Sequence, residues 1–171
     1  MTESEHSTSS TDAVGVIAVS RDDHWAHAYE DERAAVAESA FGRPGQDPSD
    51  TDFFDGSGRS LTPELGPGGE LTALRGGDSP ADPEAVRQRL RAVIAYAGDY
   101  LHQQQADVGE ALAGHGLSAD QAAQELPDLD GGSLSEDLRR ARSLFGPHPM
   151  AQELQNRGSF LHNLFVHGLR T

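Results

Sequence analysis

The sequence predicts an α+β fold: a short N-terminal strand and helix with a small antiparallel sheet, followed by a C-terminal bundle of three or four helices. Three observations lead to this prediction. A run rich in β-branched residues near the start is typical of a buried strand. Glycine- and proline-rich turns then separate short extended segments. From residue 82 onward, apolar residues recur at helical spacing and follow recognisable helix-start signals.

The first element is a strand over residues 14–19 (VGVIAV). Ser20 follows it and is expected to cap a helix, because serine oxygens accept the free N–H groups of a first helical turn. Asp23 would place a negative charge in that turn, where the helix dipole favours it. We therefore predict a helix from Ser20 to about Phe41, with Trp25 and Tyr29 on one face.

The next segment predicts a small hairpin or meander. Residues 53–54, 59–65 and 70–74 are extended candidates, separated by turn sequences at 55–58 and 67–69. Pro63 lacks an N–H group, so it confines its strand to a sheet edge or to a shorter length.

The second half is expected to be helical. Asp82-Pro83-Glu84 is a strong helix-start signal. Ser118 and Ser133 each open a capping box for a shorter helix, and a last helix is expected from about residue 150 to residue 169. The long helix after Asp82 should present one apolar stripe, interrupted by Gln104 and made of Val86, Leu90, Val93, Ala97, Leu101, Val108 and Leu112.

This division predicts a disordered tail at residues 1–12 and a single α+β domain at residues 13–171. Within that domain, residues 13–76 form the strand, helix and hairpin part, and residues 82–171 form the helical part. Residues 1–12 carry neither a basic nor an apolar signal region, and the longest apolar run is far too short for a membrane span. We therefore expect a cytoplasmic protein.

The charge balance excludes several function classes. The chain has 28 acidic residues, 13 basic residues that are all arginine, no cysteine and a formal net charge of −15. Such a surface repels nucleic acids and anionic membranes, so neither is an expected partner. Without lysine or cysteine there is no Schiff base, thiol nucleophile or disulfide, and we expect no cofactor. The acidity fits both a high-GC genome and salt adaptation, and the sequence leaves these alternatives open.

Three side chains near the start are the candidates for a metal site. On the predicted helix His24, His27 and Asp31 would lie within about 60° of one another, a spacing typical of ligands for a divalent metal. Their mean direction is roughly opposite to the face of Trp25 and Tyr29. We therefore favour a solvated polar face and assign no metal site.

An acidic turn before Ser133 resembles part of a calcium loop. With Gly131 at the sixth position, Asp128 and Asp130 would take the third and fifth positions. The first position would then be Leu126, where an acid is required, so an acidic turn that leads into the Ser133 cap is the favoured interpretation.

Residues 25–33 (WAHAYEDER) resemble the opening helix of the GrpB-like nucleotidyltransferase family, which also follows a strand. In that family a glycine-serine-threonine motif that carries the active site comes next. This chain has RPGQDP at residues 43–48 instead, so the resemblance implies no site residue here.

The last helix is apolar around much of its circumference, which is typical of a helix that is centrally buried or shared with a second chain. The expected partner-binding residues are Phe160, Leu164, Phe165 and Leu169.

The sequence therefore favours a non-enzymatic, acidic interaction or regulatory protein of adaptor type in a soluble bacterial system. It would contact a protein partner, or a second copy of itself, through its C-terminal helices. The alternative is a small enzyme that uses His, Asp and Glu, with or without a divalent metal held between helices. Arginine is the only cation available for an acidic ligand, and the helical candidates for that role are Arg87, Arg91, Arg139, Arg140 and Arg142.

Overall fold

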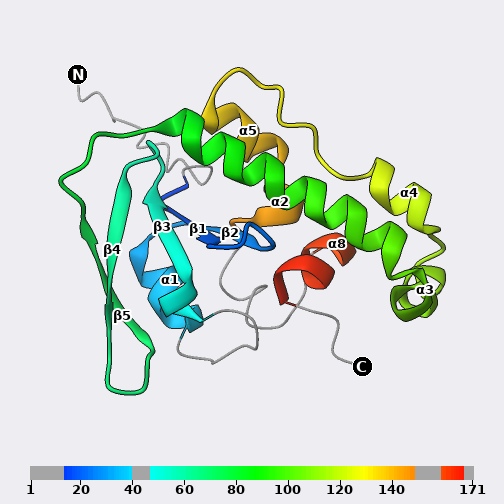
Figure 1. Ribbon diagram of the computed structural model, residues 1–171, viewed down its shortest axis with the longest axis horizontal. Coiled ribbons are helices and arrows are strands. Elements are labelled where there is room, and N and C mark those ends of the chain that lie inside the picture. Colours follow the sequence, from blue (N-terminus) through cyan, green and yellow to red (C-terminus); the bar gives the residue numbers. More distant parts are fainter. Residues whose placement is uncertain (1–13, 40–46, 149–158, 168–171) are drawn as a thin grey trace, which may run out of the picture.

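The computed structural model describes residues 14–39, 47–148 and 159–167, so the predicted tail at residues 1–12 lies outside the described part. The α+β class is confirmed: an antiparallel five-stranded sheet occupies the N-terminal half and helices follow it (Figure 1). The sheet order is β2-β1-β3-β4-β5. Its strands are β1 (Val16–Ser20), β2 (Ala26–Tyr29), β3 (Thr51–Asp55), β4 (Ser60–Leu65) and β5 (Leu71–Gly76).

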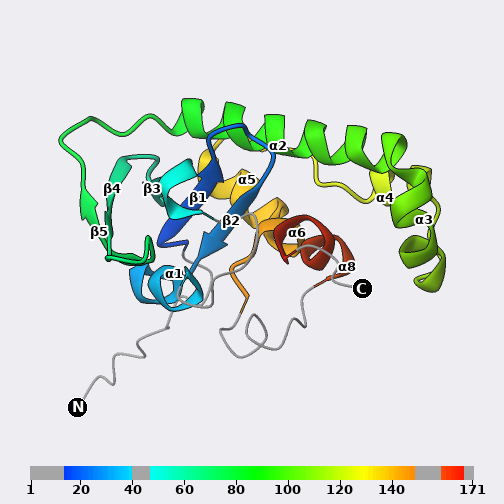
Figure 2. The same ribbon diagram turned by 60° about the horizontal axis from the view of Figure 1, so that its bottom comes forward.

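The helices cover both faces of the sheet, as Figure 2 shows for α2 and α1. Alternate residues of β1 point to opposite faces, and so Ile17 and Val19 belong to one apolar cluster while Val16 and Ala18 belong to another. The helices within the described residues are α1 (Glu32–Ser39), α2 (Pro83–Gln103), α3 (Gln105–Gly114), α4 (Ala119–Gln124), α5 (Leu134–Arg140), α6 (Arg142–Phe145) and α8 (Phe160–His162). A short 3-10 turn, Pro48–Asp50, precedes β3, and a π-helical turn, Asn163–His167, follows α8.

The predicted helix over residues 20–41 is wrong for most of its length. The chain instead makes a tight turn after β1 and returns as β2, which pairs antiparallel with β1. The Ser20 hydroxyl does accept backbone N–H groups, from His24 and Trp25, but it caps this turn and not a helix. Serine caps turns and helices through the same bond, so the local signal could not separate the two structures.

Helix α1 begins where Asp31 accepts the N–H of Ala34, so Asp31 is a helix cap and not a residue in the middle of the predicted helix. Side chains of α1 then cover the outer edge of β5. Glu32 accepts the N–H of Leu74 and Ser39 accepts the N–H of Leu71. The free N–H and C=O groups of an edge strand can pair with another chain, and these two hydrogen bonds prevent such pairing along β5.

The predicted extended segments in residues 53–74 are confirmed as β3, β4 and β5. Pro63 stands opposite Leu74, whose N–H points away from β4 toward Glu32. The missing proline donor therefore removes no bond from the β4–β5 ladder. Pairing between β3 and β4 is confined to Phe53–Leu61 and Phe54–Ser60, so β4 is short on that side, as its proline requires.

Asp55 organises the turn between β3 and β4. Its carboxylate accepts hydrogen bonds from the N–H and hydroxyl of Ser57 and from the N–H of Arg59, at 2.9, 2.6 and 3.0 Å. Partial burial acts to raise the pKa of Asp55, but these hydrogen bonds outweigh it and hold the pKa below its usual value.

We expect the substitution Asp55→Ala to lower the free energy of unfolding by about 1–2 kcal/mol near neutral pH, because the turn loses its acceptor. A carboxylate with a depressed folded-state pKa stabilises the fold above its unfolded-state pKa, about 3.9, and that contribution disappears as the pH falls through the folded-state value. The difference between wild type and variant should therefore shrink in acid. Urea unfolding across the acid range measures it, with the exposed Asp78→Ala as control; a difference that is independent of pH would contradict this account.

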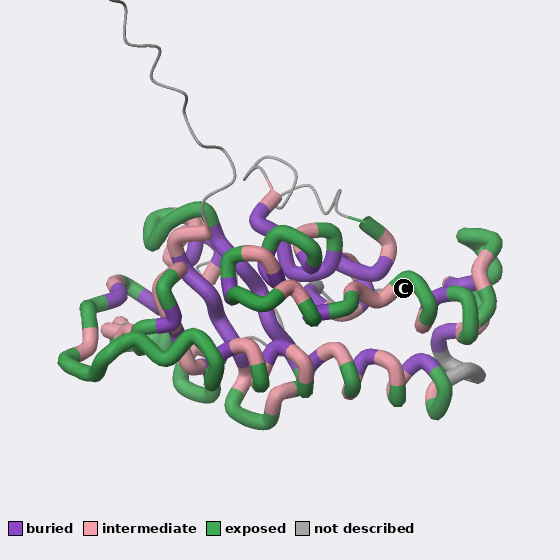
Figure 3. The backbone as a smooth tube through the Cα atoms, turned by 90° about the horizontal axis from the view of Figure 1, so that it is seen from above, coloured by how far each residue is buried: buried purple, intermediate pink, exposed green. Residues whose placement is uncertain are grey.

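The predicted helix starts at Asp82, Ser118 and Ser133 are all confirmed by side-chain caps. The long apolar helix breaks at Gln104, the polar residue that interrupts its stripe, and continues as α3. The whole stripe is buried, and Figure 3 shows buried residues recurring along α2 between intermediate and exposed ones. This face is therefore core.

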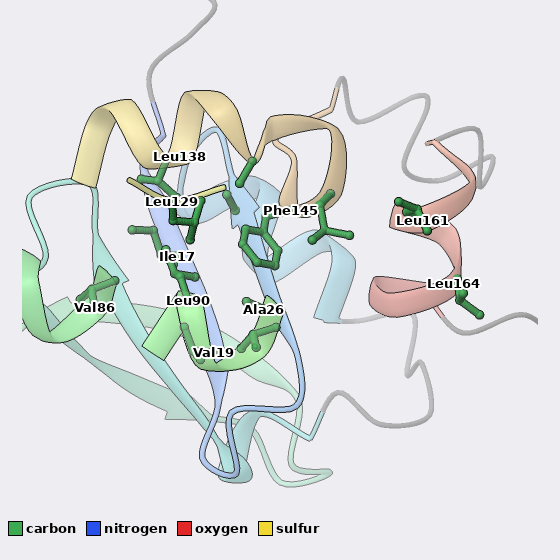
Figure 4. Packing of buried hydrophobic residues seen from close by; sticks show 14 of the residues in the cluster. Ile17, Val19, Ala26, Val86, Leu90, Leu129, Leu138, Phe145, Leu161 and Leu164 are labelled. Carbon is green, nitrogen blue, oxygen red and sulfur yellow. The ribbon is translucent and has the colours of Figure 1, made fainter. Parts of the chain in front are cut away.

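The larger apolar cluster joins the sheet to the C-terminal helices. Figure 4 shows Ile17 of β1, Leu90 of α2 and Phe145 of α6 meeting in it, with Leu161 and Leu164 of the last helical segment nearby. The two sequence halves thus share one core. No helix among the described residues combines the length and the apolar character needed to cross a membrane.

Candidate functional site

Arg89 of α2 fixes the turn between β1 and β2. Its guanidinium donates to Asp23 at 2.7 Å, to Asp52 at 2.8 Å and to the carbonyl of Ser20 at 2.7 Å. Asp23 has a φ of 57°, in the left-handed region that few residues other than glycine and asparagine adopt readily. The turn is therefore held against α2 by two charge-assisted hydrogen bonds, and the third, to Asp52, joins β3 to the same arginine. Figure 1 shows it lying beside that helix.

This docking starts a continuous row of rings, which we call the aromatic row: His24, Tyr96, Tyr100 and Phe165. The His24 and Tyr96 rings are stacked, with centroids 3.7 Å apart and planes 9° apart. Tyr96 and Tyr100 are separated by 6.2 Å, and Tyr100 meets Phe165 edge-on at 6.1 Å. The row thus connects the β1–β2 turn to the last helical segment across the surface of α2.

The aromatic row lies along one flank of the buried stripe of α2. At about 100° per residue, Arg89, Tyr96 and Tyr100 fall within about 40° of one another, and Arg87 and Arg91 lie roughly 160° away. His24 is exposed, whereas Tyr96, Tyr100 and Phe165 are half-buried. Each of these rings therefore keeps part of its surface open within the described structure.

A groove of about 440 Å³ adjoins the His24 end of the row. A hydrogen bond from the Ser20 hydroxyl lowers the pKa of Asp22, and hydrogen bonds from Ser49 lower the pKa of Asp47. These two carboxylates remain charged at neutral pH. The groove is lined by Arg21, Asp22, His24, Trp25, Asp47 and Asp50, among others.

The three metal candidates of the sequence do not share a helix face. His24 lies in the turn, His27 is buried in β2 and Asp31 caps α1, because the segment that was predicted to be one helix is a hairpin followed by a shorter helix. Within the described residues, no three His, Asp or Glu side chains form a group that could hold a metal ion.

His27 instead joins a group that we call the histidine cluster: the buried His27, Glu38 and His162, and the partly buried His148. The His27 and His162 rings lie 5.3 Å apart and the His148 and His162 rings 4.4 Å apart. His27 Nδ1 is 3.5 Å from a Glu38 oxygen, an ion-pair distance when the imidazole is protonated. Sequence spacing does not reveal this cluster, because its members come from four separate segments.

A hydrogen bond to the backbone orients the His162 ring within the histidine cluster. His162 Nδ1 lies 2.5 Å from the carbonyl of Leu144, and since a carbonyl only accepts, this nitrogen carries the proton and donates. His27 and His162 are 1% and 0% exposed. Trp25 Nε1 also donates to the carbonyl of Val166 at 2.9 Å, which ties the last helical segment to the sheet. Histidine and glutamate side chains in contact can exchange protons, but His27 of β2 and His162 of α8 are enclosed by protein.

The four expected partner-binding residues separate into different environments. Leu164 is buried, at 8% exposure, and packs in the larger core cluster. Phe160 is half-buried against the ring of His115, 4.3 Å away, and Phe165 belongs to the aromatic row. Leu169 lies outside the described residues.

The helical arginines that could have held an acidic ligand are engaged inside the chain. Arg87 pairs with Asp137 and Glu84, and Arg91 with Glu84 and the carbonyl of Leu129. Arg139 and Arg140 lie close to Glu136, and Arg142 donates to the carbonyl of Pro147.

The loop that resembled a calcium site has a structural role. Asp137, in helix α5 just after the loop, is fully buried. Its carboxylate accepts hydrogen bonds from the N–H of Gly131 in the loop and from Arg87. Ser133 caps α5, as the acidic-turn interpretation expects.

Comparison of the chain with protein-family models, curated proteins and solved structures found no match. The local resemblance to the nucleotidyltransferase helix also has no structural counterpart, since Ala26–Tyr29 is a strand. Function must therefore be argued from the site alone.

Proposed function

We propose that this chain is a non-enzymatic interaction protein of adaptor or regulatory type that contacts a protein partner through its C-terminal helices. The observation that carries the proposal is the aromatic row. Tyrosine and other aromatic side chains that are half-exposed are enriched at protein interfaces, because they offer a large contact area with few rotatable bonds. Three of the four rings belong to the helical half of the chain, on α2 and the last helical segment.

Among the residues expected from sequence, Phe165 is the one best placed for contact. Leu164 serves the core beneath it, and Phe160 lies at the side, against α3. Tyr96 and Tyr100 replace Leu164 in the proposed contact surface. Elsewhere in the described structure, Leu65 is the only large apolar side chain classed as exposed, so a broad apolar patch is not the basis of the proposal.

A photo-crosslinking amino acid placed at Tyr100 tests the proposal in cells of the source organism. We expect an adduct with one identified protein, or with a second copy of this chain, and no such adduct from the same amino acid at exposed Arg139 on α5. The complex rebuilt from pure components should weaken by about tenfold or more in Tyr100→Leu, which keeps an apolar contact and loses the ring. Equal adducts from both positions would refute the proposed surface.

A small acid–base enzyme is the second candidate, and the histidine cluster is the observation that favours it. Imidazole and carboxylate groups in contact are the usual participants in proton transfer. This candidate requires turnover of a substrate that His162→Gln abolishes while the fold persists. The leading proposal expects no histidine-dependent turnover.

A further inference from the structure

We infer that the partner presents an extended segment whose arginine or lysine side chains pack on the aromatic row. This rests on the proposed function and names the chemistry that the partner brings to the same surface. The rings, their spacing and the charge around them each support such an occupant.

The exposed parts of the rings suit cations. The face of an aromatic ring carries excess electron density and attracts a guanidinium or ammonium group within about 6 Å of the ring centre. The chain itself makes such a contact, since the Arg89 guanidinium carbon lies 5.8 Å from the centre of the Phe54 ring. His24 already covers one face of the Tyr96 ring, so a second molecule would meet the other face of Tyr96 and the partly exposed rings of Tyr100 and Phe165.

The spacing of the rings fits an extended peptide. From Tyr96 to Tyr100 and from Tyr100 to Phe165 the centroid separations are 6.2 and 6.1 Å. An extended chain rises about 3.3 Å per residue, so side chains on one of its faces recur every ~6.6 Å. Alternate residues of an extended segment would therefore meet successive rings.

Charge near the row is negative on balance. Asp99 is exposed on α2 between the two tyrosines, and Asp22 lies in the turn that carries His24, with its side chain 61% exposed. The cations beside the turn, Arg89 and Arg21, are already paired, Arg89 with Asp23 and Asp52 and Arg21 with Asp52. A basic occupant would thus gain both cation–π contact and attraction to carboxylates.

Other occupants fit this surface less well. An acidic segment or a nucleic acid would be repelled by these carboxylates and by the net charge of −15. A purely apolar helix would cover Asp22 and Asp99 without pairing them, which carries a desolvation cost. The groove beside His24 adds the carboxylates of Asp47 and Asp50 at that end of the row, together with Arg21, which is paired with Asp52.

Fluorescence anisotropy with labelled synthetic peptides and the full chain tests the inference at low salt. The probe is a short peptide of alternating arginine and serine; its controls are a peptide of the same composition with the arginines consecutive, and one of alternating glutamate and serine. We expect the alternating arginine peptide to bind most tightly. The double variant Tyr96→Leu/Tyr100→Leu should weaken its binding by about tenfold.

A matched pair of charge variants separates the row from general attraction. Asp22→Asn/Asp99→Asn and Asp128→Asn/Asp130→Asn remove the same charge, but the second pair lies in the loop between α4 and α5. Binding should weaken about tenfold in the first and less than about twofold in the second. If the tyrosine double variant does not fold, as judged by circular dichroism, Tyr96→Leu alone replaces it.

Equal affinity for wild type and the row variants, equal binding of the glutamate peptide, or no binding at all would overturn the inference. Its failure is distinguishable from failure of the proposed function. A partner that crosslinks at Tyr100 but is not displaced by the arginine peptide would leave the interaction role intact and remove the basic segment. No specific adduct at Tyr100 would remove both.

Discussion

Replacing Asp137 with asparagine is expected to destabilise the fold by about 3–5 kcal/mol, because it breaks a buried ion pair by removing one partner. The Asp137 carboxylate is 0% exposed and accepts from Arg87 Nε at 2.6 Å and from the Gly131 N–H at 2.8 Å. Asparagine keeps the size of the side chain, so the loss reports charge and hydrogen bonding and not a cavity. Chemical unfolding followed by circular dichroism measures the change.

The control is Asp128→Asn, an exposed position in the loop before α5, for which a change within about 0.5 kcal/mol is expected. A loss below about 1 kcal/mol for Asp137→Asn would show that Arg87 is satisfied by Glu84 alone, and the bond to α5 would then contribute little. The expected large loss would instead establish that the pair between Arg87 and Asp137 joins α2 to α5.

Elements whose first residues form caps or turns with close neighbours in the chain could be predicted from sequence. Asp82, Ser118 and Ser133 cap the helices that follow them because each cap is formed by residues within three positions along the chain. The turns around Asp55 and Gly69 are similarly local. These signals need no knowledge of the rest of the fold.

The segment after Ser20 could not be predicted in this way. Its aromatic residues Trp25 and Tyr29 fit both a helix face at a spacing of four and a strand face at a spacing of two. The choice depends on long-range pairing, because β1 is completed by β2 on one side and by β3 on the other. Tertiary structure therefore overrode a sound local preference.

The candidate site could not be predicted either, because its residues lie far apart along the sequence. The spacing of Tyr96 and Tyr100 is visible on the long helix. His24 stacks on Tyr96 only because Arg89 holds the β1–β2 turn, and a helix over residues 20–41 has no such turn. Likewise, His27 and His162 meet only after the sheet and the last helical segment pack together. The apolar character of the last helix is visible in the sequence. Which of its side chains belong to the core and which lie at the surface depends on how the helix packs in the fold.

The different environments of Leu164 and Phe165 in the last helical segment give a prediction with a large effect. Leu164→Ala is expected to cost about 2–5 kcal/mol of unfolding free energy, because Leu164 packs in the larger core cluster at 8% exposure and its truncation leaves a cavity. Phe165→Ala, next to it, removes a partly buried ring that packs at the edge of the same cluster and meets Tyr100 edge-on, and should cost about 1–2 kcal/mol. Thermal and urea unfolding of the two variants measure this contrast.

Binding should show the opposite order. Phe165→Ala is expected to weaken the complex formed at the aromatic row, because it removes one of the rings on which the partner packs. The conservative core variant Leu164→Met keeps the apolar volume and should leave both stability and binding nearly unchanged, so it controls for disturbance of the segment. If Phe165→Ala instead unfolds the chain as readily as Leu164→Ala, then Phe165 is core. The aromatic row would then end at Tyr100, and contact through the last helical segment would lose its support.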